Sequence, residues 1–295
     1  MTSLLQEISI EQQIVLFCSG MKMEQKDIDW SEVVKFAKTH GLLFFLYKNL
    51  KKTCAELVPD EIFTQLKNYY FANSARNLAF CVKLIRIINL FKESNITAVP
   101  FKGPVLAETV YGDIGFRSFI DLDILVRRED AVKARDLLIE NCFSLIDEIP
   151  ENQIERYLDC ENFFTLYDKS WKINIDLHWE ITGRYSLKPI YLENIYDRLE
   201  KVKLVDQDVL SLSFEDLLIY LCIHSSSHCW EKLELICSVA EIVKSGKIDD
   251  WAALEKKAGR LRCRKMLYAG LGLAKICLKL ICRKMWKNGS EKHGS

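Results

Sequence analysis

Two aspartates lie two residues apart in FRSFIDLDILV, residues 116–126, inside an otherwise apolar run. In a β-strand, residues i and i+2 lie on one face, so the carboxylates of Asp121 and Asp123 project to the same side. Two like charges at this spacing repel each other unless a cation lies close to both. The run therefore predicts either a metal site or acids paired with arginines on a solvated face. The arginines near this run are Arg117, Arg127 and Arg128.

A third carboxylate, Asp176, lies in WKINIDLHWEI, residues 171–181, which alternates polar and apolar residues as a half-buried strand does. Pairing of the two strands would bring Asp176 beside Asp121 and Asp123. Three convergent carboxylates are hard oxygen ligands suited to Mg²⁺, which leaves coordination positions for phosphate oxygens.

A turn that could bind phosphate precedes the acidic strand. In PFKGPVL, Lys102 and Gly103 fall where a predicted strand turns into a helix, and Pro104 takes the favoured first helical position. Free backbone N–H groups at a helix start bind anions, and Lys102 would add a positive charge. Arg117 has the donor fork that suits phosphate. The plainer interpretation is a Gly-Pro turn beside a surface lysine.

These motifs together resemble a known family. A phosphate-binding turn, a strand with D-x-D and a later strand with Asp follow the order of the nucleotidyltransferase superfamily of DNA polymerase β. More closely, FKGPVLAETVYGDIGFRSFIDLDILV, IDLHWEI and IHSSSHCWEKLELICSVAEIV resemble the bacterial family known as uncharacterised nucleotidyltransferases, which shares K-G, R-x-x-x-D-x-D-x-L-V and D-L-H-W motifs. The resemblance covers about residues 28–260.

The resemblance implies both a function and its residues. The implied enzyme moves a nucleoside monophosphate from a nucleoside triphosphate (NTP) to a hydroxyl and releases pyrophosphate, with Mg²⁺ as cofactor. Asp176 would also help to deprotonate the attacking hydroxyl. The implied catalytic residues and metal ligands are Asp121, Asp123 and Asp176. The implied nucleotide-binding residues are Lys102, Gly103 and Arg117.

The acceptor of the nucleotide is not readable from the sequence, and a small molecule, a protein and RNA all remain open. A second function is a catalytically inactive module of the same fold that acts by binding a protein or a nucleotide. It is motivated by Lys102-Gly103, which stand where most of the superfamily has Gly-Ser. Ser238, where relatives often carry an aspartate, is a second departure from the family pattern.

Two histidines lie one helical turn apart in a predicted helix that begins near Ser213. His224 and His228 fall on the same stripe as Leu217 and Leu221, which favours buried histidines that brace this helix against the acidic strands. The competing interpretation is contact with substrate. The candidate substrate contacts are His178, His224 and His228.

The predicted fold class is α+β, with a small mixed sheet flanked by helical regions. Helical spacing dominates the N-terminal part, the central part alternates short strands with helices, and helices return after about Arg184. The predicted divisions are an N-terminal helical region 1–95, a nucleotidyltransferase core 96–183, a C-terminal helical region 184–288 and a disordered tail 289–295. The predicted strands of the core are 96–102, 119–126, 143–147, 162–168 and 171–181.

Composition limits the partners and the compartment. The 295 residues carry 41 basic and 41 acidic side chains, and a net charge of zero does not favour RNA as the acceptor. Eleven scattered cysteines without a C-x-x-C pair indicate reduced thiols. Lys275 and Lys279 interrupt the longest apolar stretch, and no charged leader precedes an apolar core, so we expect a cytoplasmic protein without stable membrane insertion. The oligomeric state stays open.

Overall fold

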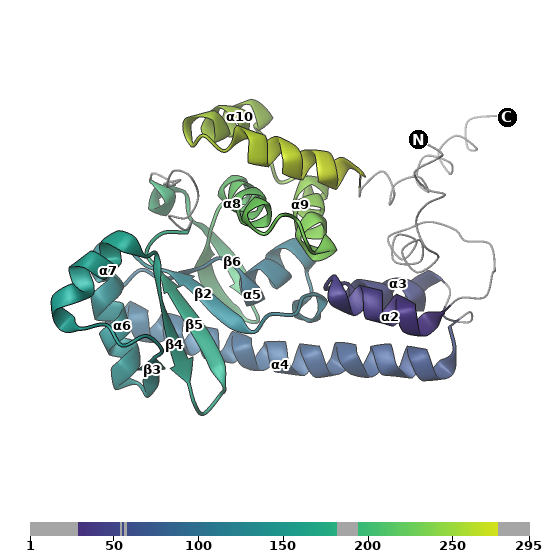
Figure 1. Cartoon of the computed structure of the whole chain (residues 1–295), viewed down its shortest axis with the longest axis horizontal. Coiled ribbons are helices and arrows are strands. Elements are labelled where there is room, and N and C mark those ends of the chain that lie inside the picture. The colour runs from purple at the N-terminus through teal and green to yellow at the C-terminus, as the bar shows by residue number, and fades with distance from the viewer. Residues whose placement is uncertain (1–28, 54, 56–57, 182–193, 277–295) are drawn as a thin grey trace.

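The computed structural model describes residues 29–53, 55, 58–181 and 194–276 (Figure 1). A mixed five-stranded sheet lies between one long helix on one side and a group of C-terminal helices on the other (Figure 1). This arrangement confirms the α+β class. Among the described residues, none of the helices is long and apolar enough to cross a bilayer.

The sheet has the order β1-β2-β5-β4-β3, and β2 and β5 form its parallel pair. The other neighbours are antiparallel. The strands are β1 Val99–Pro100, β2 Asp121–Leu125, β3 Phe143–Leu145, β4 Phe163–Asp168 and β5 Ile173–His178. The first strand is shorter than predicted. Pro100 has no N–H to donate to a ladder, which confines it to the edge of the sheet.

One face of the sheet is covered by α4 (Asp60–Glu93) and α6 (Ala131–Glu140). Later in the chain, α7 (Ile154–Cys160) lies between β3 and β4 in the sequence. Leu122 and Ile124 of β2 are buried on the covered face in one apolar cluster with Leu84 and Phe91 of α4. Full burial of such a side chain stabilises the fold by about 1.5–3 kcal/mol. The apolar half of the D-x-D strand thus anchors it, and its acidic half is left for the opposite face.

The opposite face of the sheet meets the C-terminal helices α8 (Phe214–Ser227), α9 (Leu233–Ser245) and α10 (Trp251–Arg260) (Figure 1). A second apolar cluster joins Leu125 of β2 and Phe101 to the buried stripe of α8. Ser213 caps α8 by accepting a hydrogen bond from the backbone N–H of Asp216, as the sequence predicted. The acidic face of β2 is therefore turned toward α8.

The N-terminal helices α2 (Trp30–Thr39) and α3 (Leu43–Thr53) pack on the first half of α4 and form a third apolar cluster. A hairpin of β6 (Glu200–Leu204) and β7 (Gln207–Ser211) was not predicted, because residues 184–288 were expected to be helical. Its turn at Val205 and Asp206 lacks the glycine or asparagine that usually marks a two-residue hairpin loop. The tail predicted at 289–295 lies outside the described residues.

Candidate functional site

The register of β2 and β5 brings the predicted carboxylates together. Asp123 lies opposite Asp176, and Asp121 lies opposite Asn174. Because both strands alternate their side chains in the same phase, the three acids share one face of the sheet. The structure thus contains the strand pairing that the meeting of the three acids requires.

Asp123 is the most deeply buried of the three acids, with 4% of its surface exposed. Its Oδ1 accepts a hydrogen bond from Lys102 Nζ at 2.7 Å, and His178 Nε2 lies 3.1 Å from the same oxygen. Burial acts to raise the pKa of Asp123, but the charge of Lys102 and the contact with His178 outweigh it and lower the pKa to about 2. Asp123 therefore stays ionised in the folded protein.

The arginines offered as partners of these acids on a solvated face have other contacts. Arg128 pairs with Asp159, Arg127 lies over the ring of Tyr196, and Arg117 pairs with Glu234. The interpretation of the D-x-D pair as a surface salt-bridge pattern with these arginines is therefore wrong. The cation beside Asp123 is Lys102, which is only 25% exposed.

Asp121 and Asp176 lie in a different electrostatic environment from Asp123. Burial raises the pKa of Asp121 to about 6, and the negative charge of Asp123 adds to the shift. Burial also raises the pKa of Asp176. Thr165, opposite Asp176 on β4, donates a hydrogen bond to its Oδ1 at 3.0 Å. This bond orients the Asp176 carboxylate and leaves Oδ2 for another contact.

The predicted turn at Lys102 and Gly103 leads into α5 (Gly103–Leu106), and Pro104 lies in its first turn as expected. Gly103 has φ +51°, in the left-handed region that favours glycine. A Cβ built on Gly103 would lie 3.6 Å from the backbone oxygen of Asp121. The turn therefore lies against the start of the acidic strand, and Lys102 reaches over it to Asp123.

Arg117 has a partner, Glu234, that no local pattern in the sequence indicates. Its Nε and Nη2 lie 2.7 Å and 2.6 Å from Oε1 of Glu234 on α9, and both side chains are largely buried. Asn73 and Asn77 of α4 donate hydrogen bonds to the backbone oxygen of Arg117. Arg117 thus connects the loop before β2 to α4 and α9, and one edge of its donor fork is occupied by a carboxylate.

The three candidate histidines are distributed along one line of aromatic contacts. The ring centroids are 5.2 Å apart for His178 and Phe101, 5.2 Å for Phe101 and Tyr220, 5.6 Å for Tyr220 and His224, and 4.6 Å for His224 and His228. His178 is buried beside Asp123, whereas His228 is exposed. Burial, with the nearby charge of Lys102, lowers the pKa of His224 to about 3, so this ring is neutral.

Tyr220 of α8 is a further neighbour of the site. Lys102 Nζ lies 5.6 Å from its ring centroid. Burial raises the pKa of Tyr220 to about 12, so it is a neutral phenol. No local pattern in the sequence indicates this contact, because Tyr220 lies in a buried apolar stretch of α8.

Three ligand atoms, one each from Asp123, Asp176 and His178, lie within 4.8 Å of one another. Two oxygens on opposite sides of a metal with bonds near 2.1 Å are about 4.2 Å apart. An adjustment of at most about 0.6 Å in any pair would therefore fit these atoms to one ion. Among the described residues, this is the group whose donors suit a divalent metal.

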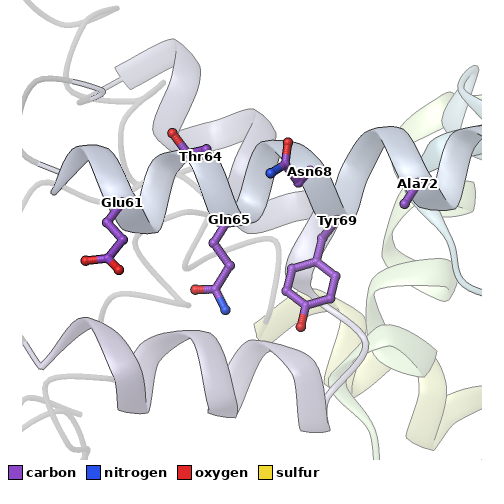
Figure 2. A pocket seen from close by; sticks show the side chains of 6 residues that line it. All are labelled: Glu61, Thr64, Gln65, Asn68, Tyr69 and Ala72. Atoms are coloured by element: carbon purple, nitrogen blue, oxygen red, sulfur yellow. The ribbon is translucent and has the colours of Figure 1, made fainter.

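A groove of about 520 Å³ lies along the first half of α4, away from these acids (Figure 2). Its lining consists of one face of that helix, without residues from the sheet or from the Lys-Gly turn. The lining residues are Glu61, Thr64, Gln65, Asn68, Tyr69 and Ala72. Because they provide no convergent carboxylates, the candidate functional site is the acidic cluster on the sheet and not this groove.

A sequence profile described as "Uncharacterised nucleotidyltransferase" matches residues 26–279. Two solved structures show a weaker likeness. ANT(2″)-Ia in complex with adenylyl-2″-tobramycin has 12% identity over 63% of this chain and 99% of its own, with a TM-score of 0.45. An antigenic nucleotidyltransferase-like protein from Paracoccidioides brasiliensis has 14% identity over 70% and 92%, with a TM-score of 0.37. No curated protein matches the sequence significantly.

Proposed function

The chain belongs to the uncharacterised nucleotidyltransferase family and is an enzyme of this type; from this premise we propose that it moves a nucleoside monophosphate from an NTP to a hydroxyl group. The observation that carries the proposal is the opposition of Asp123 and Asp176 across β2 and β5, with Lys102 beside them. In transfers of phosphorus groups, positioning and charge neutralisation supply most of the rate.

The proposed reaction forms one bond to phosphorus and breaks another. The acceptor oxygen attacks the α-phosphorus, the bond between that phosphorus and the α,β-bridging oxygen breaks, and pyrophosphate leaves with the bonding electrons. Asp176 takes the proton of the acceptor hydroxyl and passes it to solvent.

The acids and His178 would hold a divalent metal, for which Mg²⁺ is the expectation from the carboxylates. Such an ion, when bound, neutralises the charge of the triphosphate. Lys102 supplies a fixed positive charge on the same face, and the Gly103 turn allows it to lie close to the acidic strand. We assign Lys102 and Gly103 to the triphosphate of the nucleotide.

Arg117 contributes to the same site in a different way. Its guanidinium is bound to Glu234, so we assign it first to holding the loop before β2 against α9. Direct contact with phosphate would require Arg117 to share or exchange this carboxylate. A double substitution that removes both charges separates these two roles.

Transfer from labelled nucleotides tests the proposed function. The protein is incubated with an NTP labelled at the α- or the γ-phosphorus, together with small-molecule, protein and RNA fractions of a cell extract. Nucleotidyl transfer places only the α-label in one fraction, and Asp123→Asn/Asp176→Asn abolishes this incorporation. Incorporation of the γ-label, or equal α-labelling by the variant, would contradict the proposal. Binding without any transfer would favour the inactive module.

A further inference from the structure

His178 occupies a position in the acidic cluster that the carboxylates alone do not explain. It is buried, with 8% of its side chain exposed, at the end of β5, two residues after Asp176. Its Nε2 faces Asp123 Oδ1 at 3.1 Å. Two adjacent ligands of an octahedral metal with bonds near 2.1 Å are about 3.0 Å apart. The observed separation therefore fits two ligands of one ion as well as a hydrogen bond.

The contacts of the other ring nitrogen, Nδ1, do not fix which nitrogen of His178 carries the proton when a metal binds. Nδ1 is buried and has no hydrogen-bond partner within the described part of the chain. A neighbouring group that donated a hydrogen bond to Nδ1 would have placed the ring proton on Nε2, and a protonated Nε2 cannot bind a metal. In the metal-free protein Nε2 donates a hydrogen bond to the ionised Asp123. Because no described group donates to Nδ1, the proton can move to Nδ1 when a metal binds, and the Nε2 lone pair is then available to the ion.

From these contacts we propose that His178 is a metal ligand with Asp123 and Asp176, and that this nitrogen gives the site a preference for Mn²⁺ over Mg²⁺. The inference rests on the proposed function, because the ion would be the one that binds the triphosphate. Mg²⁺ is a hard cation that takes oxygen ligands, whereas imidazole suits first-row transition metals. A site of two carboxylates and one imidazole favours an ion that accepts both kinds of donor.

The orientation of the neighbouring side chains supports this ligand set. Thr165 holds Oδ1 of Asp176, as outer hydrogen bonds commonly do for metal ligands. Lys102 contacts Asp123 from the side of the turn and would remain beside the bound ion, where it shares the Asp123 carboxylate. Asp121, which is not part of the three-residue group, would then act through its charge or through a bound water.

Pulsed electron paramagnetic resonance of Mn²⁺ added to the wild-type protein and to His178→Asn tests the proposal. The spectra are recorded with Mn²⁺ alone and with Mn²⁺ and ATP whose nitrogens are ¹⁵N. A directly bound imidazole gives a ¹⁴N coupling, and His178→Asn removes it. Mn²⁺ that binds without ¹⁴N coupling overturns the inference and leaves the proposed function standing. Absence of Mn²⁺ and Mg²⁺ binding, with and without ATP, overturns both.

Metal affinities give an independent measure of the same ligand. His178→Asn should weaken Mn²⁺ binding about 10-fold or more while Mg²⁺ binding falls less than about threefold. Thr165→Val is the matched control, because it removes an outer hydrogen bond without removing a ligand and should weaken both ions by a similar factor. Equal losses for the two ions in His178→Asn would overturn the inference. Circular dichroism of both variants checks that the fold is intact.

Discussion

Asp123 on β2 lies directly opposite Asp176 on β5 in the parallel register of the central sheet. The two residues are far apart in the sequence, and the register alone makes them neighbours on one face. A shift by one residue would move an entire strand's side chains to the other face. The apolar residues of β2, Leu122 and Ile124, help to fix this register because they are buried on the opposite face of the sheet against α4 and α6. The site therefore depends on the core beneath it.

Neutralising the two acids of the D-x-D strand should change the stability of the metal-free protein in opposite directions at pH 7. The pKa of Asp121 rises from 3.8 to about 6 on folding, so its ionised form is penalised above pH 6. Asp121→Asn removes this penalty and should stabilise by up to about 3 kcal/mol. The gain should fade as the pH falls from 6 to 4, where the wild-type carboxylate takes up its proton.

Asp123→Asn should destabilise the same protein at pH 7. The pKa of Asp123 falls to about 2 on folding, so its contribution is present above pH 4 and is lost as the pH falls toward 2. The expected loss is about 2 kcal/mol or more, because Lys102 also loses its carboxylate. Urea unfolding with a chelator, from pH 4 to pH 8, measures both variants. Shifts of the same sign at pH 7 would contradict the electrostatic account.

Substitution of Gly103 should reduce nucleotide affinity beyond its effect on stability. Gly103 and Gly112 both have a positive φ, +51° and +65°. Gly103→Ala and Gly112→Ala should each destabilise by about 1–2 kcal/mol, because alanine is strained in the left-handed region. Only Gly103→Ala moves the turn that carries Lys102. We expect an increase in the dissociation constant for NTP in that variant, measured by calorimetry. Equal binding by the two variants would remove Gly103 from the nucleotide site.

The buried pair of Arg117 and Glu234 should be strongly coupled in stability. Arg117→Gln or Glu234→Gln alone leaves a buried charge without its partner, and we expect a loss of about 3–5 kcal/mol. The double variant should lose clearly less than the sum, because no unpaired charge remains. Unfolding in urea measures the cycle. Additive losses would show that the pair is not an interacting unit.

The same double variant determines whether Arg117 also binds phosphate. If Arg117 acts only as a structural link, the folded double variant should bind NTP nearly as tightly as the wild type. A clear loss of affinity with a preserved fold would show direct phosphate contact. The single variant Glu234→Gln provides the control that keeps the arginine.

The sequence predicted those parts of the site that lie within one strand or one turn. The alternation around Asp121, Asp123 and Asp176 and the Gly-Pro start of α5 are local patterns, and the structure contains the expected strands and helix there. The register between strands then determined contacts that the local patterns could not predict. The pattern placed His178 on the same polar face as Asp176, but its contact with Asp123 depends on how β2 and β5 align.

The remaining parts of the site depend on contacts between distant elements. Glu234 and Arg117 are separated by 117 residues, and no local pattern pairs them. Tyr220 lies in an apolar helix, where an aromatic residue is expected in the core whether or not it contacts the site. The β6-β7 hairpin has a turn without glycine or asparagine, so its local signal was weak.

Calorimetric binding of each NTP, with and without a divalent metal, tests the central claim most directly. The proteins compared are the wild type, Asp121→Asn/Asp123→Asn and the exposed control Asp208→Asn, whose carboxylate pairs only with Lys203 on the β6-β7 hairpin among the described residues. The account predicts metal-dependent binding of at least one NTP by the wild type and the control, and its loss in the double variant. Absence of binding of every NTP by the wild type, or metal-dependent binding unchanged in the double variant, would contradict it.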